Sequence, residues 1–139
     1  MTPEDINRVR LGFAVAAREA EAFAGRFYAR LFEIDPALRR LFPDDLAGQR
    51  AKLAQALAVL VGSLDRMDAV APGLARLGAA HAGYGVEPRH FDAVGAALID
   101  TLADTLGGAF DAPARAAWAT LYGIVADAMK AAMRLEVAA

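Results

Sequence analysis

The chain has 139 residues, of which 57% are hydrophobic and 23% are charged, and its formal net charge is −2. This length and composition indicate one packed domain and exclude a disordered chain. The absence of cysteine excludes disulfides and thiolate metal sites. No basic stripe runs along the sequence, so we expect no nucleic-acid partner.

Neither the N-terminus nor any apolar run suggests export or a membrane span. The first ten residues, MTPEDINRVR, carry acids and lack the apolar core of a signal peptide. The longest apolar run, residues 56–62, is far shorter than the roughly 20 residues that cross a bilayer. We therefore expect a cytoplasmic protein with no membrane partner.

Helix signals recur through the first half of the chain. Residues 2–5, TPED, predict a helix start, because threonine can cap, proline suits the first position and acids favour the N-terminal dipole. Apolar residues then recur with helical spacing over residues 6–17 and again over 23–34. Residues 35–43 predict a short helical turn that ends at Phe-Pro, followed by a polar loop over 43–48.

The second half continues the same pattern. Long helices are predicted over residues 47–66, 69–81 and 88–106, and a last helix begins near residue 111. Strand signals do not appear. The sequence therefore predicts an all-α domain of seven to eight helices around one core.

The stretch from residue 74 to residue 91 links two of these helices through a histidine and a bend. Leu74, Leu77 and His81 share one helical face, and the chain then breaks at a glycine-rich segment, residues 83–88. A histidine on an apolar face is more often a satisfied core residue than a ligand. Here the surrounding helices supply an apolar pocket with few polar groups, which suits a neutral imidazole as the axial ligand of haem iron.

Other chemical motifs are missing. The one serine, Ser63, lies within a predicted helix, so a serine hydrolase is not expected. Two histidines without cysteine do not make an ordinary zinc site. Gly83 and Gly85 lack the third glycine and the strand of a dinucleotide-binding fingerprint.

A second constellation lies in the first half of the chain. Tyr28 is on the second predicted helix, Phe42 ends the short turn, and Gln49 and Leu53 point the same way from the next helix. With these residues in place, the sequence resembles bacterial single-domain globins, which are related to Vitreoscilla-type haemoglobin and to the globin domain of flavohaemoglobins. The segments that carry the resemblance are RFYARLF, DPALRRLF, QRAKL, LGAAHAGYGV, HFDAVG and AWATLYGIVAD.

The resemblance implies one globin domain, residues 1–139, with a globin fold and a non-covalent haem b. It implies that His81 is the iron ligand and that the carbonyl of Leu77 accepts a hydrogen bond from its other ring nitrogen. The remaining residues expected to bind the cofactor are Phe42 on the haem face, Leu53 on the distal side, Val86, Phe91 and Val94 on the proximal wall, and Lys52 near a propionate. A free surface lysine is the other reading of Lys52.

The resemblance places Tyr28 and Gln49 as the reactive residues on the distal side. A hydroxyl and an amide would each donate a hydrogen bond to bound dioxygen, which carries negative charge. Such a bond contributes about 1.5–3 kcal/mol, or roughly ten- to a hundred-fold in dissociation. By composition alone, an ordinary core tyrosine and an exposed glutamine would be the better explanation; the match to the family in register favours the distal roles.

The chain departs from the flavohaemoglobin pattern on the proximal side. Phe91 and Met133 occupy the positions of a tyrosine and a glutamate that push electron density toward iron, and Glu136 lies one helical turn away. We therefore expect that the strong push favouring oxygen cleavage is missing.

Four further positions have less specific predictions. His90 is expected at the surface or at a helix start, and Trp118 in the core. Tyr84 either supports the bend or approaches the haem edge. The adjacent pair Arg39 and Arg40 is expected to be a solvated helix end.

We therefore predict a haem globin that reversibly binds dioxygen, nitric oxide and carbon monoxide. We also hypothesise nitric oxide dioxygenase activity; because no flavin domain is seen in the chain, electrons would come from a separate reductase. A haem-based gas or redox sensor and a haem-free interaction module are the alternatives. The sequence leaves open a monomer or a homodimer, and Tyr28 or water as the sixth ligand.

Overall fold

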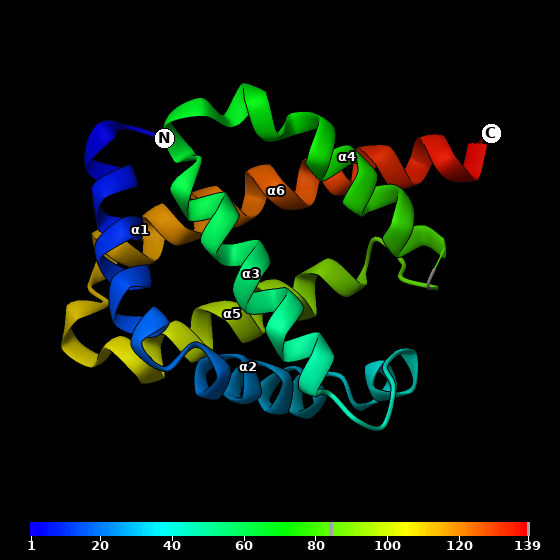
Figure 1. Ribbon diagram of the computed structural model, residues 1–139, viewed down its shortest axis with the longest axis horizontal. Coiled ribbons are helices and arrows are strands. Elements are labelled where there is room, and N and C mark those ends of the chain that lie inside the picture. The colour runs from blue at the N-terminus through cyan, green and yellow to red at the C-terminus, as the bar shows by residue number, and fades with distance from the viewer. Residues whose placement is uncertain (84, 139) are drawn as a thin grey trace.

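The computed structural model describes the backbone of residues 1–83 and 85–138 and the side chains of residues 1–82 and 85–134. The described chain is all-α, as predicted, and its helices enclose a common core (Figure 1). The helices are α1 (Pro3–Ala16), α2 (Ala20–Ile34), α3 (Ala47–Gly62), α4 (Met67–Gly83), α5 (His90–Leu106) and α6 (Ala112–Ala138). Short 3-10 turns separate them: η1 (Ala17–Glu19), η2 (Pro36–Leu41), η3 (Leu64–Arg66) and η4 (Gly107–Ala109).

Helix number and boundaries differ modestly from the prediction. The described residues form six α-helices, below the predicted seven to eight, because the segment after Asp35 is a 3-10 turn. The helix predicted to reach residue 66 ends at Gly62, and Ser63 donates to the carbonyl of Leu60 at 3.1 Å. The apolar pattern does not reveal this break, since Leu64 beyond it is still buried.

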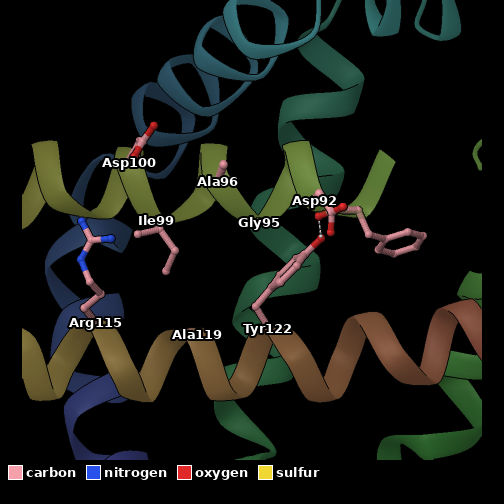
Figure 2. Close-up of a pocket in the computed structure, with 9 residues that line it drawn as sticks. Asp92, Gly95, Ala96, Ile99, Asp100, Arg115, Ala119 and Tyr122 are labelled. Atoms are coloured by element: carbon pink, nitrogen blue, oxygen red, sulfur yellow. Dashed lines mark hydrogen bonds between the residues drawn. The ribbon is translucent and has the colours of Figure 1, made fainter. Parts of the chain in front are cut away.

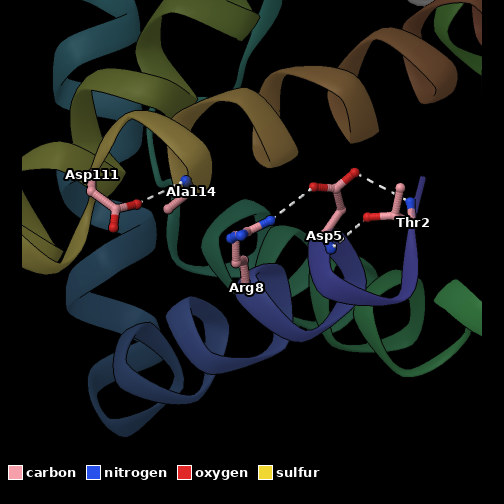
Figure 3. Close-up of polar contacts among 5 residues, drawn as sticks. All are labelled: Thr2, Asp5, Arg8, Asp111 and Ala114. Carbon is pink, nitrogen blue, oxygen red and sulfur yellow. Dashed lines mark hydrogen bonds and ion pairs between the residues drawn. The ribbon is translucent and has the colours of Figure 1, made fainter.

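Local capping explains where α1 and α6 begin (Figure 3). The Thr2 hydroxyl accepts from the amide of Asp5 at 3.1 Å, and the Asp5 carboxylate accepts from the amide of Thr2 at 3.2 Å. These reciprocal bonds form a capping box and satisfy two amides that a helix start leaves unpaired. At α6, the Asp111 carboxylate accepts from the amide of Ala114 at 3.0 Å.

Two apolar clusters fill the interior. The larger one joins α1, α2, α5 and α6, and its largest fully buried apolar side chains are those of Trp118, Leu31, Leu102, Leu121 and Val9. Trp118 is 1% exposed, which confirms its predicted place in the core. The smaller cluster consists of Phe91, Ala126, Met129 and Met133, with Ala82 and Val86 packed against it. No helix in the described part of the chain is long and apolar enough to cross a membrane.

The helices α4 and α6 approach each other closely at Gly78. A Cβ atom at this position would lie 2.5 Å from the carbonyl oxygen of Met129 and 2.9 Å from its Cα. Real Cβ atoms do not approach backbone atoms this closely, so the packing of α4 on α6 requires glycine here. This contact lies one turn before His81 and therefore determines the position of the helix that carries it.

Candidate functional site

His81 lies near the end of α4 and is half-buried. Its Nδ1 atom is 2.6 Å from the carbonyl oxygen of Leu77, the acceptor that the sequence analysis expected. When Nδ1 carries the proton and donates to this carbonyl, Nε2 carries the lone pair that a metal needs. Leu77 itself is 43% exposed, so an apolar side chain lies at the surface beside the histidine.

The backbone carbonyl of His81 accepts a hydrogen bond that closes the bend after this residue. The amide of Val86 donates to the His81 carbonyl at 3.1 Å, and the amide of Gly85 donates to Ala82 at 3.2 Å. This pair of bonds is the Schellman pattern that ends helices. Gly85 has a φ of 85°, a conformation that glycine adopts without strain. Tyr84, for which two roles were considered, lies outside the described residues.

Tyr28 projects from α2 into an aromatic group and is 5% exposed. Its ring centroid lies 5.6 Å from that of Phe42, in an edge-to-face arrangement. Burial raises the pKa of Tyr28 above its ordinary value, and a hydrogen bond from the Gln49 side chain only partly opposes this effect. The hydroxyl is therefore neutral at physiological pH and is available as a donor.

The first turns of α3 carry the other residues expected on this side. Gln49 and Leu53 are half-buried, and Leu53 packs against the larger core cluster. Lys52 lies between them in sequence and is exposed. The structure thus brings Tyr28, Phe42 and Gln49 together, and Leu53 follows Gln49 by one helical turn.

The helices that carry the two halves of the site have separate supports. α3 packs on α2, whereas α4 packs mainly on α6, and α3 and α4 make little direct contact (Figure 1). The position of His81 therefore depends mainly on the packing of α4 on α6, and the positions of Tyr28 and Gln49 depend on the packing of α3 on α2.

The residues expected on the proximal wall divide between the two clusters. Val86 and Phe91 belong to the smaller cluster with Met133, and Val94 packs against the larger one. The Tyr122 hydroxyl donates to the Phe91 carbonyl at 2.6 Å. The ammonium of Lys130 lies 5.7 Å from the centroid of the Phe91 ring. The side chain of Glu136 is outside the described residues.

Of two expectations about polar residues, the first is confirmed at a helix start and the second needs correction. His90 is at a helix start as predicted, but it is buried, and its Nδ1 accepts from the amide of Glu87 at 3.0 Å. Arg40 is exposed, whereas Arg39 is half-buried and donates to backbone carbonyls of the following loop. Residue types alone carry no direct signal for these contacts, because each joins a side chain to a backbone group: the Glu87 amide in the first and the loop carbonyls in the second.

An open groove lies between α5 and α6 (Figure 2), and none of the predicted distal residues lines it. It has a volume of about 440 Å³ and is lined by small residues, a few charged side chains and Tyr122. On α5 it uses the face with Asp92, Ala96 and Ile99, whereas Val94 is on the face toward the core. Of the predicted site residues, only Phe91 borders this groove.

An all-α domain with a hydrogen-bonded histidine on one helix and a tyrosine–glutamine pair on two others is typical of helical haem proteins. The globin family model matches residues 25–129. The chain belongs to the globin family.

Individual relatives and solved structures agree with this assignment. The chain is 32% identical to a flavohemoprotein of Bacillus subtilis over 117 residues, covering 82% of this chain and 29% of that protein. It is 34% identical to neuroglobin of Dissostichus mawsoni over 116 residues, covering 73% of each. A bacterial globin from Campylobacter jejuni has the same fold, with a TM-score of 0.87, 20% identity and coverage of 99% and 100%. The chain thus spans less than a third of the flavohemoprotein.

Membership of this family implies that the chain binds haem, and its residues fit that group. The donor set offers one imidazole whose Nδ1 is beside a neutral carbonyl. Apolar side chains that could contact a flat macrocycle are only half-buried, as expected of a surface that a cofactor completes; these are Phe42, Leu53, Val86 and Val94.

Proposed function

We propose that this globin holds haem b non-covalently, with His81 as the axial ligand, and reversibly binds dioxygen, nitric oxide and carbon monoxide. The observation that carries the proposal is the neutral, buried Tyr28 hydroxyl beside Gln49 and Phe42. When bound, haem supplies the iron that takes up the gas molecule. Phe42, Leu53, Val86, Phe91 and Val94 would surround the cofactor, and Lys52 would reach a propionate.

The distal residues would stabilise a ligand that carries partial negative charge. Tyr28 would donate a hydrogen bond through its hydroxyl, and Gln49 through its amide. Since burial keeps the proton on the Tyr28 oxygen, this donor is present without a cost for protonation. Leu53 would exclude water from the same space.

The proximal residues favour reversible binding over cleavage of an oxygen–oxygen bond. The Nδ1 atom of His81 faces a backbone carbonyl and not a carboxylate. Phe91 and Met133 lie in an apolar cluster, and neither side chain can take a proton from the ring. The ammonium of Lys130, which lies over the Phe91 ring, has no acceptor for a proton either.

Absorption spectra of the purified protein test this proposal. We expect a strong Soret band that shifts on reduction and again under carbon monoxide, and that is lost or altered in His81→Ala. His90→Ala is the matched control, because His90 has a role at the start of α5. If the protein shows no haem band after addition of hemin, haem binding is refuted and the haem-free interaction module becomes the better hypothesis.

We further propose nitric oxide dioxygenase activity with the help of a reductase. One nitric oxide, one dioxygen and one electron give one nitrate, so every turnover needs an electron donor. The donor pair Tyr28 and Gln49 and the similarity to flavohemoproteins support this activity. When the oxygenated protein is mixed rapidly with nitric oxide, the oxygenated form should disappear at once and yield one nitrate per haem. Slow decay of the oxygenated form without nitrate would exclude the activity.

A haem-based sensor would instead bind a partner protein in a ligand-dependent way, which a pull-down would detect.

A further inference from the structure

The guanidinium of Arg39 holds the backbone that follows η2. Its Nη1 donates to the carbonyls of Phe42 at 3.4 Å and Pro43 at 3.0 Å, and its Nη2 donates to the carbonyl of Asp44 at 3.0 Å. In return, the Arg39 carbonyl accepts from the Phe42 amide at 3.2 Å. One side chain therefore organises three consecutive residues of the connection to α3.

This arrangement needs arginine rather than any cation. Carbonyls at the end of a helical segment have no partner within it, and Pro43 has no amide with which to form a compact turn of its own. A guanidinium offers several N–H groups in a fixed planar fork, so it can bridge carbonyls of successive residues. A lysine ammonium is a point charge on a flexible chain and cannot hold all three in one geometry.

The same guanidinium also contacts the aromatic group from its other side. Its Cζ lies 5.3 Å from the centroid of the Phe32 ring. Phe32 packs edge-to-face on Phe42 at 5.5 Å and stacks on Tyr28 at 6.1 Å. Because Tyr28 and Phe42 also contact each other, Arg39 completes a unit of three rings.

We propose that Arg39 is a positioning residue for the haem pocket: it fixes Phe42 through its backbone and through Phe32 before the cofactor binds. The inference rests on the proposed haem binding. A pocket wall that is already ordered loses less conformational entropy when the ligand binds, so the ligand is held more tightly and dissociates more slowly. Arg39 would act through Phe42 and would not touch the haem itself.

Two substitutions at Arg39 and their counterparts at Arg40 test this role. Arg39→Lys keeps the charge but removes the fork, and Arg39→Gln removes both. Arg40→Lys and Arg40→Gln make the same chemical changes at the adjacent exposed position. Far-UV circular dichroism would establish that each variant retains its helices.

The first readout is loss of hemin to excess apomyoglobin. Arg39→Lys should lose hemin roughly tenfold faster than wild type, on the scale of one hydrogen bond to a charged group, and the Arg40 variants should not differ from wild type. The second readout is amide hydrogen exchange of the haem-free proteins. Exchange should accelerate in peptides covering residues 42–46 of Arg39→Lys and stay unchanged over residues 85–94.

Three results would overturn the proposal. Equal hemin loss and equal exchange in the Arg39 and Arg40 variants would show that Arg39 is an ordinary surface cation. Faster exchange throughout the chain would indicate general destabilisation in place of a local hold. Faster exchange over residues 42–46 without faster hemin loss would show that Arg39 orders the loop but does not help the protein to retain haem. If wild type binds no hemin, the proposed function fails, and exchange in the haem-free proteins still decides whether Arg39 orders this loop.

Discussion

Tyr28 is buried, whereas its predicted distal partner Gln49 is only half-buried. Tyr28 comes from α2, contacts Phe42 beyond η2 and interacts with Gln49 of α3. Three separate segments therefore control one donor. The chemistry of the site depends on how well these segments hold a single oxygen atom in place.

Replacement of this hydroxyl should weaken retention of dioxygen. Tyr28→Phe preserves the ring and its aromatic contacts but removes the donor, so we expect dioxygen to dissociate roughly ten- to a hundred-fold faster. Stopped-flow displacement by carbon monoxide measures this rate. Tyr122→Phe is the matched control, since that hydroxyl binds the Phe91 carbonyl at the groove between α5 and α6. An unchanged rate in Tyr28→Phe would remove Tyr28 from the distal assignment.

The ionisation state of Tyr28 gives a second prediction at this scale. Burial raises its pKa above the ordinary value of 10.0, so the neutral donor should persist through the whole neutral and mildly alkaline range. We expect the dissociation rate of dioxygen to stay constant between about pH 6 and pH 9. A rise within this range that is absent from Tyr28→Phe would mean that the proton leaves Tyr28 at lower pH than its burial predicts.

At the scale of elements, the contact between α4 and α6 positions His81. Gly78→Ala would place a methyl group against the backbone of Met129, and Met129 cannot retract without moving α6. We expect a loss of about 1–3 kcal/mol in the free energy of unfolding, as for other overpacked sites, and a changed iron–histidine stretching frequency in resonance Raman spectra.

A second glycine of the same helix provides the control. A Cβ at Gly73 would meet only the Arg76 side chain, at 3.9 Å. Gly73→Ala should therefore stabilise the protein by about 0.5–1 kcal/mol through helix propensity, and it should not alter the iron–histidine stretch. Equal effects of the two substitutions on denaturation would contradict the role assigned to the Gly78 contact.

Sequence periodicity predicted most elements correctly but not all of their ends. Apolar spacing depends on which side chains face the core, and Leu64 faces it whether or not α3 is broken at Ser63. Similarly, Pro88 predicts where a helix can start, but α5 begins at His90. The His90 side chain accepts a hydrogen bond from the amide of Glu87 there. Boundaries set by a single hydrogen bond are not visible in a hydrophobic pattern.

The candidate site was predictable only in part for a related reason. The residues with distinctive chemistry, His81 and Tyr28, could be singled out from the sequence and the resemblance. The groups that hold them act through backbone atoms: Arg39 on three carbonyls and Gly78 on Met129. Such contacts depend on the path of the backbone, within one loop for Arg39 and between two helices for Gly78, and not on the type of residue they contact.

At the scale of the whole molecule, the buried Tyr28 and the half-buried Tyr122 should make stability fall at alkaline pH. Burial raises the pKa of Tyr28, and burial together with the Asp92 carboxylate raises that of Tyr122. Above about pH 10 the unfolded chain loses protons that the folded chain retains, so stability must fall as pH rises. The decline has an upper bound of about 1.4 kcal/mol per pH unit for each tyrosine.

Denaturant titrations of the haem-free protein from about pH 9 to pH 11 measure this slope. Lysines titrate in the same range, so the informative quantity is the difference between wild type and Tyr122→Phe. The free energy of unfolding of Tyr122→Phe should fall less steeply with rising pH than that of wild type. Identical slopes would imply that the Tyr122 hydroxyl ionises as readily in the folded protein as in the unfolded chain.

The buried indole of Trp118 has an optical consequence. It is the only tryptophan in the sequence, it is 1% exposed, and its Nε1 finds no acceptor among the described residues. Its fluorescence therefore comes from one rigid, dry position and should lie at short wavelength. A haem bound within the same small domain would quench that emission by energy transfer. The intensity of tryptophan fluorescence would therefore be proportional to the amount of haem-free protein. Intrinsic fluorescence thus reports the fraction of the protein that holds haem, without any added label.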